Sequence, residues 1–386
     1  MNRVSTVELV VLTPPGRGAI ASVLARGAEA IDVVSRRFHG SAGRSLADEP
    51  LGKILVGRWG DPQAGEEVVV CRRAVDRIEV HSHGGSAAVD AVVASLVELG
   101  CRQIDWRKAI GTSRSDQISA AAEIALTQAP TLRTAETLWD QRAGALFRAL
   151  QSVASALNLG DTATAVGTVN ELLARASVGL HLTTPWHVAL AGEPNVGKSS
   201  LMNALCGYER AIVHATPGTT RDLVTTETAI DGWPVQLIDT AGLHDSHDPL
   251  EAAGMELARR RLAEANLVLV LVDASCGWVG DDESLTAAWP NALVVANKCD
   301  LVPDSMQLAL PPGAILVSAL ERQGLAELER AIAERLVLRP PEAGAAVPFL
   351  EIHVTVLQKI ALALAAGRVS EARQLLGEFG LFPAEC

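Results

Sequence analysis

The chain has 386 residues, of which 48% are hydrophobic, and its formal net charge is −12. This length predicts two or three domains with full hydrophobic cores, and the acidic charge argues against a protein that simply coats nucleic acid. No apolar run approaches the ~20 residues needed to span a bilayer, and six cysteines without a Cys-x-x-Cys pair or an N-terminal secretion signal predict a reduced, cytoplasmic protein.

The first part of the chain, residues 1–108, mixes short β-type runs with Gly and Pro turns. The runs are VELVVL, EEVVVC and RIEV, and an amphipathic stretch follows them, so we expect a small α+β domain. Residues 109–185 are rich in Ala and Leu at helical spacing, interrupted by a proline and a glycine. This pattern predicts a group of helices.

In residues 186–340, apolar strand candidates alternate with helical stretches. The candidates are HVALAG, VQLID, LVLVLVD, ALVVAN and AILVS, and their alternation is typical of a doubly wound parallel sheet. The segment RPPEAGAAVP is a linker, and the rest of residues 341–386 is again helical. Because helical stretches flank the α/β segment, we expect one helical domain into which a nucleotide-binding domain is inserted.

The segment GEPNVGKSS carries the strongest signal. It follows the strand HVALA and opens the helix SLMNALCG, which is the context of a phosphate-binding loop. Gly192 and Gly197 would let the loop curl so that backbone N–H groups point at the β-phosphate. Lys198 would bridge the β- and γ-phosphates, and Ser199 would bind Mg²⁺ through its hydroxyl. The alternative, a Gly-rich turn without a ligand, is disfavoured because further nucleotide motifs follow in order.

The next two motifs concern the γ-phosphate and the metal. The segment TPGTTRD offers Thr219 and Thr220 on a loop that would close over the γ-phosphate and Mg²⁺. Asp239 ends the strand VQLID and would hold Mg²⁺ through water. The backbone N–H of Gly242 would contact the γ-phosphate.

The segments NKCD and VSAL concern the base. Asn297 would bond the purine, and Asp300 would accept two hydrogen bonds from guanine that adenine cannot donate. The backbone N–H of Ala319 would face the guanine O6. In this order the motifs predict GTP binding by the following residues: Asn195, Val196, Gly197, Lys198, Ser199, Ser200, Thr219, Thr220, Asp239, Thr240, Ala241, Gly242, Asn297, Lys298, Asp300, Ser318, Ala319 and Leu320.

These motifs resemble the G domain of the bacterial tRNA-modification GTPase family MnmE, also called TrmE. The matching segments are GEPNVGKSSLMNAL, AIVHATPGTTRD, DTAGL, NKCD and VSAL. TPPGRG near the N-terminus and EVHSHGG, from Glu79 to Gly85, resemble the N-terminal domain of that family. The resemblance implies a Ras-like P-loop G domain inserted in an α-helical domain and preceded by a small α+β domain.

The resemblance also bears on Leu243, which stands where Ras-type proteins have the Gln that orients the attacking water. Family members lack this Gln and use a K⁺ ion beside the nucleotide and a downstream Glu, which Glu251 matches. The alternative for Glu251 is a solvated acid at a helix N-terminus. The resemblance implies four K⁺ positions: Asn195, His214, Thr216 and Thr219. It implies a catalytic set of Glu251, Lys198, Thr220 and Arg221, with Mg²⁺ held by Ser199, Thr220 and, through water, Asp239.

The sequence departs from the family at its folate site and at its end. Glu79 matches a folate-contacting Glu, but Leu24 stands where the family has an Arg, and SDQIS lacks the folate-contacting Lys. These differences count against folate as a cofactor. Family members end in Cys-x-Gly-Lys, whereas this chain ends in LFPAEC, so Cys386 is expected to match by accident. His81 and His83 share one strand face but lack a further metal ligand, which favours a structural turn over a metal site.

Two functions follow from the resemblance. In the first, the protein is the homodimeric GTPase subunit that modifies the wobble uridine of tRNA, adding a carboxymethylaminomethyl-type group with a flavin-dependent partner. In the second, it is a divergent paralogue that keeps the GTP switch but acts as an assembly factor without modification chemistry. The architecture favours the first function, while the altered end and folate site favour the second. Neither function involves a membrane.

Overall fold

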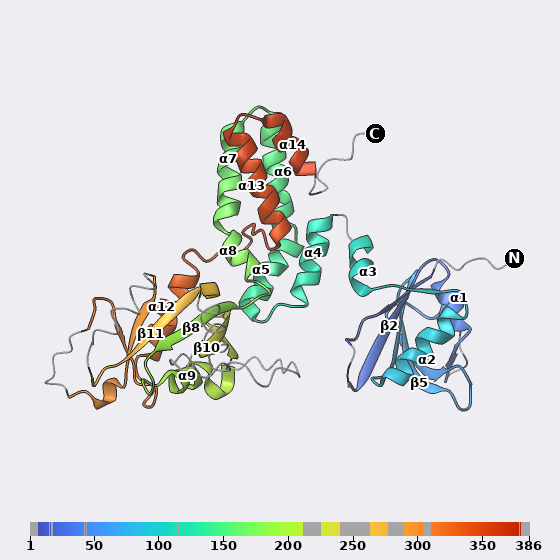
Figure 1. Ribbon diagram of the computed structural model, residues 1–386. Coiled ribbons are helices and arrows are strands. Elements are labelled where there is room, and N and C mark those ends of the chain that lie inside the picture. The colour runs from blue at the N-terminus through green and yellow to red at the C-terminus, as the bar shows by residue number, and fades with distance from the viewer. Residues whose placement is uncertain are drawn as a thin grey trace, which may run out of the picture. The chain divides into compact units, whose positions relative to one another are not determined.

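The computed structural model of the chain divides into two compact units, Met1–Arg114 and Ser115–Cys386. Figure 1 traces both units from blue at the N-terminus to red at the C-terminus. The structure describes residues 7–14, 16, 18–41, 43, 45–113, 116–210, 225–239, 263–276, 289, 291–303, 310–377 and 379.

The first unit is built on a seven-stranded sheet with the order β3-β4-β5-β6-β2-β1-β7. Its strands alternate buried and exposed residues, as in β6, where Ile78 and Val80 are buried. This alternation lets one face of the sheet pack on α1 and α2. The elements are β1 Glu8–Val11, β2 Ile20–Arg26, α1 Ala30–Ser35, β3 Phe38–Gly40, a 3₁₀ turn Leu46–Asp48, β4 Ile54–Trp59, β5 Glu66–Ala74, β6 Arg77–His83, α2 Ser86–Val97, β7 Arg102–Gln103 and α3 Trp106–Ser113.

The second unit contains helices from two distant parts of the chain. Helix α13 packs against α7 and α14 packs against α6, so the stretches before and after the α/β segment share a core. Thr131 caps α5 and Asp161 caps α7, each accepting a backbone N–H bond directly after a predicted helix break. The helices are α4 Gln117–Leu126, α5 Leu132–Arg142, α6 Ala145–Asn158, α7 Thr162–Ala174, α8 Ala176–Leu180, α13 Glu351–Ala365 and α14 Val369–Gly377.

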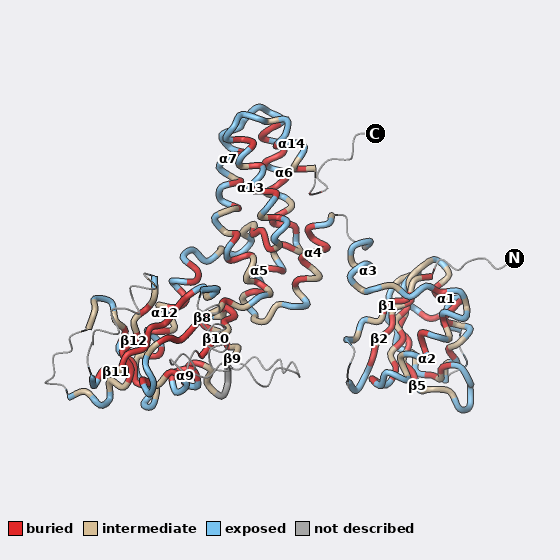
Figure 2. Tube along the Cα trace, in the orientation of Figure 1, coloured by how far each residue is buried: buried red, intermediate tan, exposed pale blue. Residues whose placement is uncertain are grey.

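The α/β part of this unit is a six-stranded sheet with the order β13-β12-β11-β8-β10-β9. Its central strands are buried along their length, as the red tube of Figure 2 shows for β10 and β11. The five strands expected from the sequence run parallel. The elements are β8 Trp186–Gly192, α9 Lys198–Arg210, β9 Thr225–Ile230, β10 Trp233–Asp239, β11 Leu267–Asp273, β12 Leu293–Asn297, a 3₁₀ turn Cys299–Leu301, β13 Ile315–Leu316 and α12 Leu325–Leu336.

Strand β9 was not among the expected strands, and among the described residues of this sheet it alone pairs antiparallel, with β10. Its sequence, TTETAI, is mostly polar, and only two of its six residues are buried. An edge strand of this kind gives little hydrophobic signal. The difference extends the sheet without changing the parallel order of the predicted strands.

The chain that returns from the α/β part is fixed to α5 by one buried side chain. Gln141 is 0% exposed. Its Nε2 donates to the carbonyl oxygen of Ala345 at 2.9 Å, and its Oε1 accepts from the N–H of Val347 at 3.0 Å. The amide thus satisfies two backbone groups that lie outside any helix or strand.

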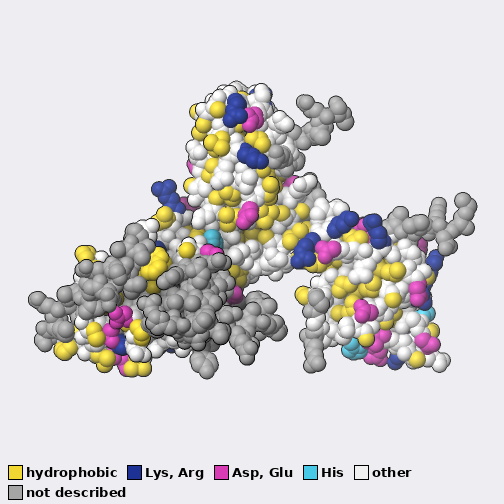
Figure 3. All heavy atoms as spheres, in the orientation of Figure 1, with side chains coloured by type: hydrophobic (Ala, Val, Ile, Leu, Met, Phe, Trp, Pro, Cys, Tyr) yellow, Lys and Arg dark blue, Asp and Glu magenta, His cyan; other side chains and the backbone are white. Residues whose placement is uncertain are grey.

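Basic and acidic side chains are interspersed among hydrophobic ones on the face shown in Figure 3.

Candidate nucleotide-binding site

The loop that joins β8 to α9 depends on its glycines. Gly192 and Gly197 have φ angles of 144° and 98°, and Asn195 between them has a φ of 65°. A Cβ on Gly192 would lie 2.3 Å from the carbonyl oxygen of Leu271, and one on Gly197 would lie 2.3 Å from Nδ2 of Asn297. Both positions therefore require glycine for conformation and for space.

Lys198 opens α9 and folds back over the loop. Its Nζ donates to the carbonyl oxygens of Gly192 at 2.9 Å and Glu193 at 2.7 Å, and the residue is only 6% exposed. Burial holds the pKa of Lys198 below its ordinary value, although the nearby Asp239 carboxylate opposes this shift. The loop therefore holds a partly desolvated ammonium group, whose charge acts strongly on an anion placed beside it.

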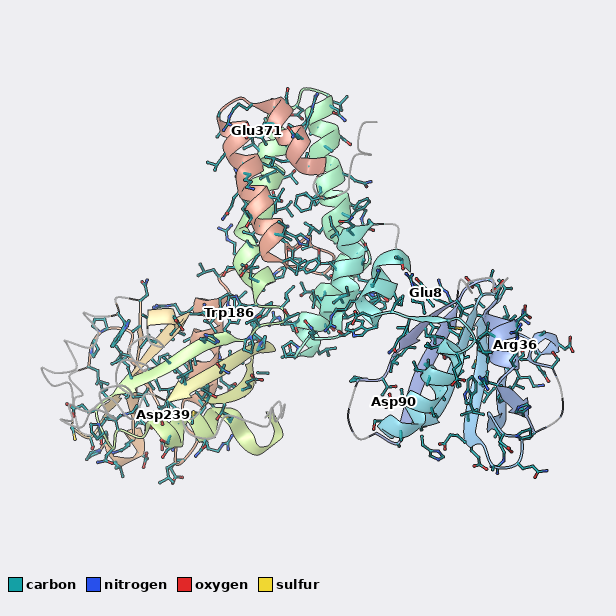
Figure 4. The ribbon with its side chains drawn as sticks, turned by 45° about the vertical axis from the view of Figure 1, so that its right-hand side comes forward. Glu8, Arg36, Asp90, Trp186, Asp239 and Glu371 are labelled. Carbon is teal, nitrogen blue, oxygen red and sulfur yellow. The ribbon has the colours of Figure 1, made fainter. Side chains whose placement is uncertain are left out.

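Ser199 and Asp239 bring two oxygens together beside this lysine. The hydroxyl of Ser199 donates to Oδ2 of Asp239 at 2.7 Å, and Asp239 is buried at the end of β10, where Figure 4 labels it. Strands β8 and β10 are parallel neighbours, so the loop after one and the carboxylate ending the other meet at the same sheet edge. Hydroxyl and carboxylate oxygens are the ligands that Mg²⁺ prefers.

Asn297 connects the phosphate-binding loop to the segment that contains Ala319. Its Nδ2 donates to the carbonyl oxygen of Val196 at 2.9 Å, and its Oδ1 accepts from the N–H of Ala319 at 3.1 Å. The side chain is 2% exposed, so both polar ends of a buried amide are satisfied. The amide therefore fixes the position of two loops that the sequence assigns to different parts of one nucleotide.

Lys298 forms an ion pair that was not predicted from the sequence. Its Nζ lies 2.6 Å from Oδ2 of Asp273, the last residue of β11, and its backbone is left-handed, with a φ of 63°. The signal was available, because Asp273 ends a buried strand as Asp239 does. Asp273 thereby positions the lysine of the Asn-Lys-Cys-Asp segment at the edge of the sheet.

The remaining described positions lie around this edge. Asp300 is exposed in the 3₁₀ turn after β12, and Leu320 is 80% exposed. Ser318 is buried, exchanges two backbone hydrogen bonds with Gln323, and its Oγ accepts from the N–H of Glu321 at 3.0 Å. Ser200 is exposed in the first turn of α9. These contacts set the shape of the loop that follows β13.

Several sequence-predicted positions lie outside the described residues: His214, Thr216, Thr219, Thr220, Arg221, Thr240, Ala241, Gly242, Leu243, Glu251 and Cys386. The structure therefore brings together the phosphate-loop residues, Asp239 and the base-side residues. It gives no geometry for the expected K⁺ loop or for the expected catalytic glutamate.

In the first unit, Glu79 is engaged by neighbouring side chains. Its Oε2 accepts from Nε of Arg73 at 2.7 Å and lies 3.4 Å from Nε2 of His81, whose Nδ1 is 2.7 Å from the hydroxyl of Ser22. His83 pairs with a different carboxylate, from β5. No cluster of three or more His, Cys, Asp or Glu side chains suited to a metal occurs among the described residues.

A six-stranded α/β sheet with a phosphate-binding loop, a serine–aspartate oxygen pair and an Asn-Lys-Cys-Asp segment at one edge defines a P-loop GTPase domain. The model of the family described as 50S ribosome-binding GTPase matches residues 187–298. The chain as a whole belongs to the tRNA modification GTPase MnmE family, as the comparison with curated relatives shows. The predicted α/β fold class with a Ras-like P-loop G domain is thereby confirmed.

The relatives align over most of both chains. The MnmE protein of Moorella thermoacetica is 32% identical over 385 residues, covering 88% of this chain and 83% of the relative. That of Koribacter versatilis is 33% identical over 374 residues, covering 86% and 82%. A crystal structure of Aquifex aeolicus Era is 27% identical with a TM-score of 0.32, over 46% of this chain and 67% of that one. None of the helices in the described ranges is long and apolar enough to cross a membrane.

Proposed function

We propose that the protein is a Mg²⁺-dependent, K⁺-activated GTPase that serves in wobble-uridine modification of tRNA. In this proposal it works as a homodimer in the cytoplasm with a flavin-dependent partner. Domain limits of 1–108, 109–185, 186–340 and 341–386 belong to the same proposal. The observation that carries it is the placement of Lys198 and the Ser199–Asp239 pair at the sheet edge where Asn297 joins the base-side loop.

The residues at this edge suit the groups that a GTPase needs. The Ser199 hydroxyl and the Asp239 carboxylate would hold Mg²⁺, which would neutralise charge on the β- and γ-phosphates when bound. Lys198 would bind the same phosphates from the loop side. Asn195 has the left-handed backbone of a residue that turns the loop sharply, and in the proposal it contributes to K⁺ binding.

Folate is not included in the proposed function. Leu24, which stands where the family resemblance calls for an arginine, is the register partner of Glu79 across β2 and β6. The charged partner of Glu79 is instead Arg73, from β5. Leu24 offers no positive charge to the carboxylates of a folate, and the carboxylate of Glu79 is already paired, so these contacts do not match the folate site of the family. This local difference favours the second candidate, a paralogue that keeps the GTP switch without the modification chemistry.

Complementation distinguishes the two candidates. The gene is supplied to a bacterium that lacks its own MnmE, and wobble uridines are analysed by mass spectrometry of digested tRNA. Restored modification is expected under the proposed function. Unmodified uridine in cells where this protein is soluble and hydrolyses GTP, even with its native partner co-expressed, would support the paralogue instead.

The base preference gives an independent prediction. Asp300→Asn should weaken GTP binding and strengthen binding of xanthosine triphosphate, because xanthine presents a carbonyl where guanine has its 2-amino group. Competition of both nucleotides against a fluorescent GTP analogue measures the change. Glu321→Gln, an acid replaced by its amide on a nearby loop, should leave both affinities unaltered. Equal competition by ATP and GTP against the unaltered protein would contradict the assignment of Asp300.

A further inference from the structure

The hairpin formed by β9 and β10 extends from the nucleotide-binding edge to a tight turn. The two strands pair at six positions, from Trp233 opposite Ile230 to Ile238 opposite Thr225. Asp231 and Gly232 form the turn with φ angles of 49° and 77°, as in the two-residue turns that suit twisted hairpins. At about 3.3 Å per residue, β10 separates this turn from Asp239 by roughly 20 Å.

One side chain from the helical part contacts the turn residues Asp231 and Gly232 and the next residue, Trp233. Nη1 of Arg133, on α5, donates to the backbone carbonyl of Asp231 at 2.5 Å and to its Oδ2 at 2.6 Å. The guanidinium lies 4.7 Å from the ring centre of Trp233, which is 1% exposed. A Cβ on Gly232 would lie 3.2 Å from the Cβ and Cδ of Arg133. We call these four residues the hairpin clasp.

Helix α5 also holds the chain that leads back into the helical part. At its C-terminal end, Asp140 accepts from the N–H of Gly344 at 2.7 Å, and Gln141 bonds Ala345 and Val347 as described above. That chain continues into α13. Helix α5 is therefore tied at one end to the hairpin and at the other to the returning segment.

Two grooves flank the clasp. One, of about 610 Å³, is lined by α5, Trp233 and residues 341–343, and the other, of about 710 Å³, is lined by the hairpin turn and α12. Trp233 borders both. The side chains of Arg133 and Asp231 are 35% and 60% exposed, so water screens the ion pair, and the hydrogen bond to the Asp231 carbonyl and the contact with Trp233 add to it.

We propose that the hairpin clasp transmits the nucleotide state of the GTP site to the helical part, with Arg133 as the coupling residue. The inference rests on the proposed GTP site, because β10 carries Asp239 beside Ser199. A hydrogen-bonded hairpin moves as a unit, so a shift at the Asp239 end displaces the turn. Arg133 converts that displacement into movement of α5, which the returning segment passes to α13.

Hydrogen exchange of the full-length chain tests whether the hairpin clasp couples the GTP site to the helical part. Amide exchange is compared between GDP and guanosine 5′-(β,γ-imido)triphosphate, with Mg²⁺ and K⁺, in peptides from residues 192–206 and 132–142. In the unaltered protein, both regions are expected to change between the two nucleotides, by about fivefold or more in exchange rate. Arg133→Ala should abolish the change in residues 132–142 while preserving that in residues 192–206.

The matched control is Arg142→Ala, on the same helix. Arg142 also stacks on a tryptophan, Trp139, and pairs with Glu123, but these partners belong to the helical part. Its loss should leave the nucleotide-dependent change in residues 132–142 intact. Two results would overturn the hairpin clasp alone. In the first, residues 192–206 of the unaltered protein respond to the nucleotide while residues 132–142 do not. In the second, residues 132–142 respond in Arg133→Ala as they do in the unaltered protein. Exchange in residues 192–206 that does not change with either nucleotide would contradict the proposed function, and the role of the hairpin clasp with it.

Discussion

Replacing Glu251 by Ala should lower the rate of GTP hydrolysis by roughly 10²–10³-fold while leaving GTP affinity nearly unchanged. The reason is that Leu243 has no side-chain hydrogen bond to offer the attacking water, so the proposed water-orienting group must come from elsewhere. A residue that acts mainly in the transition state affects turnover and not ground-state binding. Single-turnover hydrolysis and equilibrium binding of a fluorescent GTP analogue measure the two quantities.

A second acid serves as the control for Glu251. Glu327 lies in the first turn of α12. It is therefore a solvated acid at a helix N-terminus, which is the alternative interpretation of Glu251. Glu327→Ala should leave hydrolysis unchanged. The same assay, repeated with Na⁺ in place of K⁺, should show turnover slower by about an order of magnitude or more. Equal rates in the two salts, or equal effects of the two Ala variants, would contradict the proposed mechanism.

Gly197→Ala should reduce GTP affinity by roughly a hundredfold or more, since backbone strain and the loss of a buried hydrogen bond each cost about 1–3 kcal/mol. The φ of 98° disfavours any residue with a Cβ, and the new methyl group would lie 2.3 Å from Nδ2 of Asn297. Asn297 would then have to leave Val196, which separates the phosphate loop from the base-side loop. Isothermal titration with GTP and Mg²⁺ measures the loss.

Gly167 provides the matched glycine control. It lies within α7, and a Cβ added there would meet no atom within 4 Å. Gly167→Ala should leave GTP affinity unchanged and raise the thermal stability slightly, because alanine favours a helix by about 1 kcal/mol over glycine. GTP affinity retained in Gly197→Ala would show that the loop does not need this glycine.

The sequence was most informative where chemistry forces both residue type and spacing. Four of the five parallel strands of the second sheet, β8, β10, β11 and β12, are buried runs typical of central strands, and Gly192, Gly197 and Lys198 lie where the loop pattern put them. Strand β9 was missed because TTETAI is polar. Asp273 is recognisable in the sequence as an acid that ends a buried strand, but its pairing with Lys298 also requires β11 and β12 to be neighbours, which sheet order decides.

The hairpin clasp illustrates a second limit of sequence reasoning. The dipeptide Asp231-Gly232 is a strong turn signal, but the flanking polar strand concealed the hairpin. Nothing in the residues around Arg133 indicates that this side chain contacts a turn 98 residues away. Such contacts depend on how helices and sheet pack together, which local spacing does not encode.

Segments from both sides of the α/β part share one helical core, and this affects how the chain folds. Helices α6 and α7 meet α13 and α14 only after the whole intervening domain has been synthesised. On a ribosome, the earlier helices therefore emerge before the helices that cover their apolar surface, while the G domain can fold first. Its folding brings the two connections closer together and reduces the entropy cost of closing so long a loop. We therefore expect a nascent chain whose emerged part ends near residue 340 to hold a folded G domain beside unassembled helices that recruit chaperones.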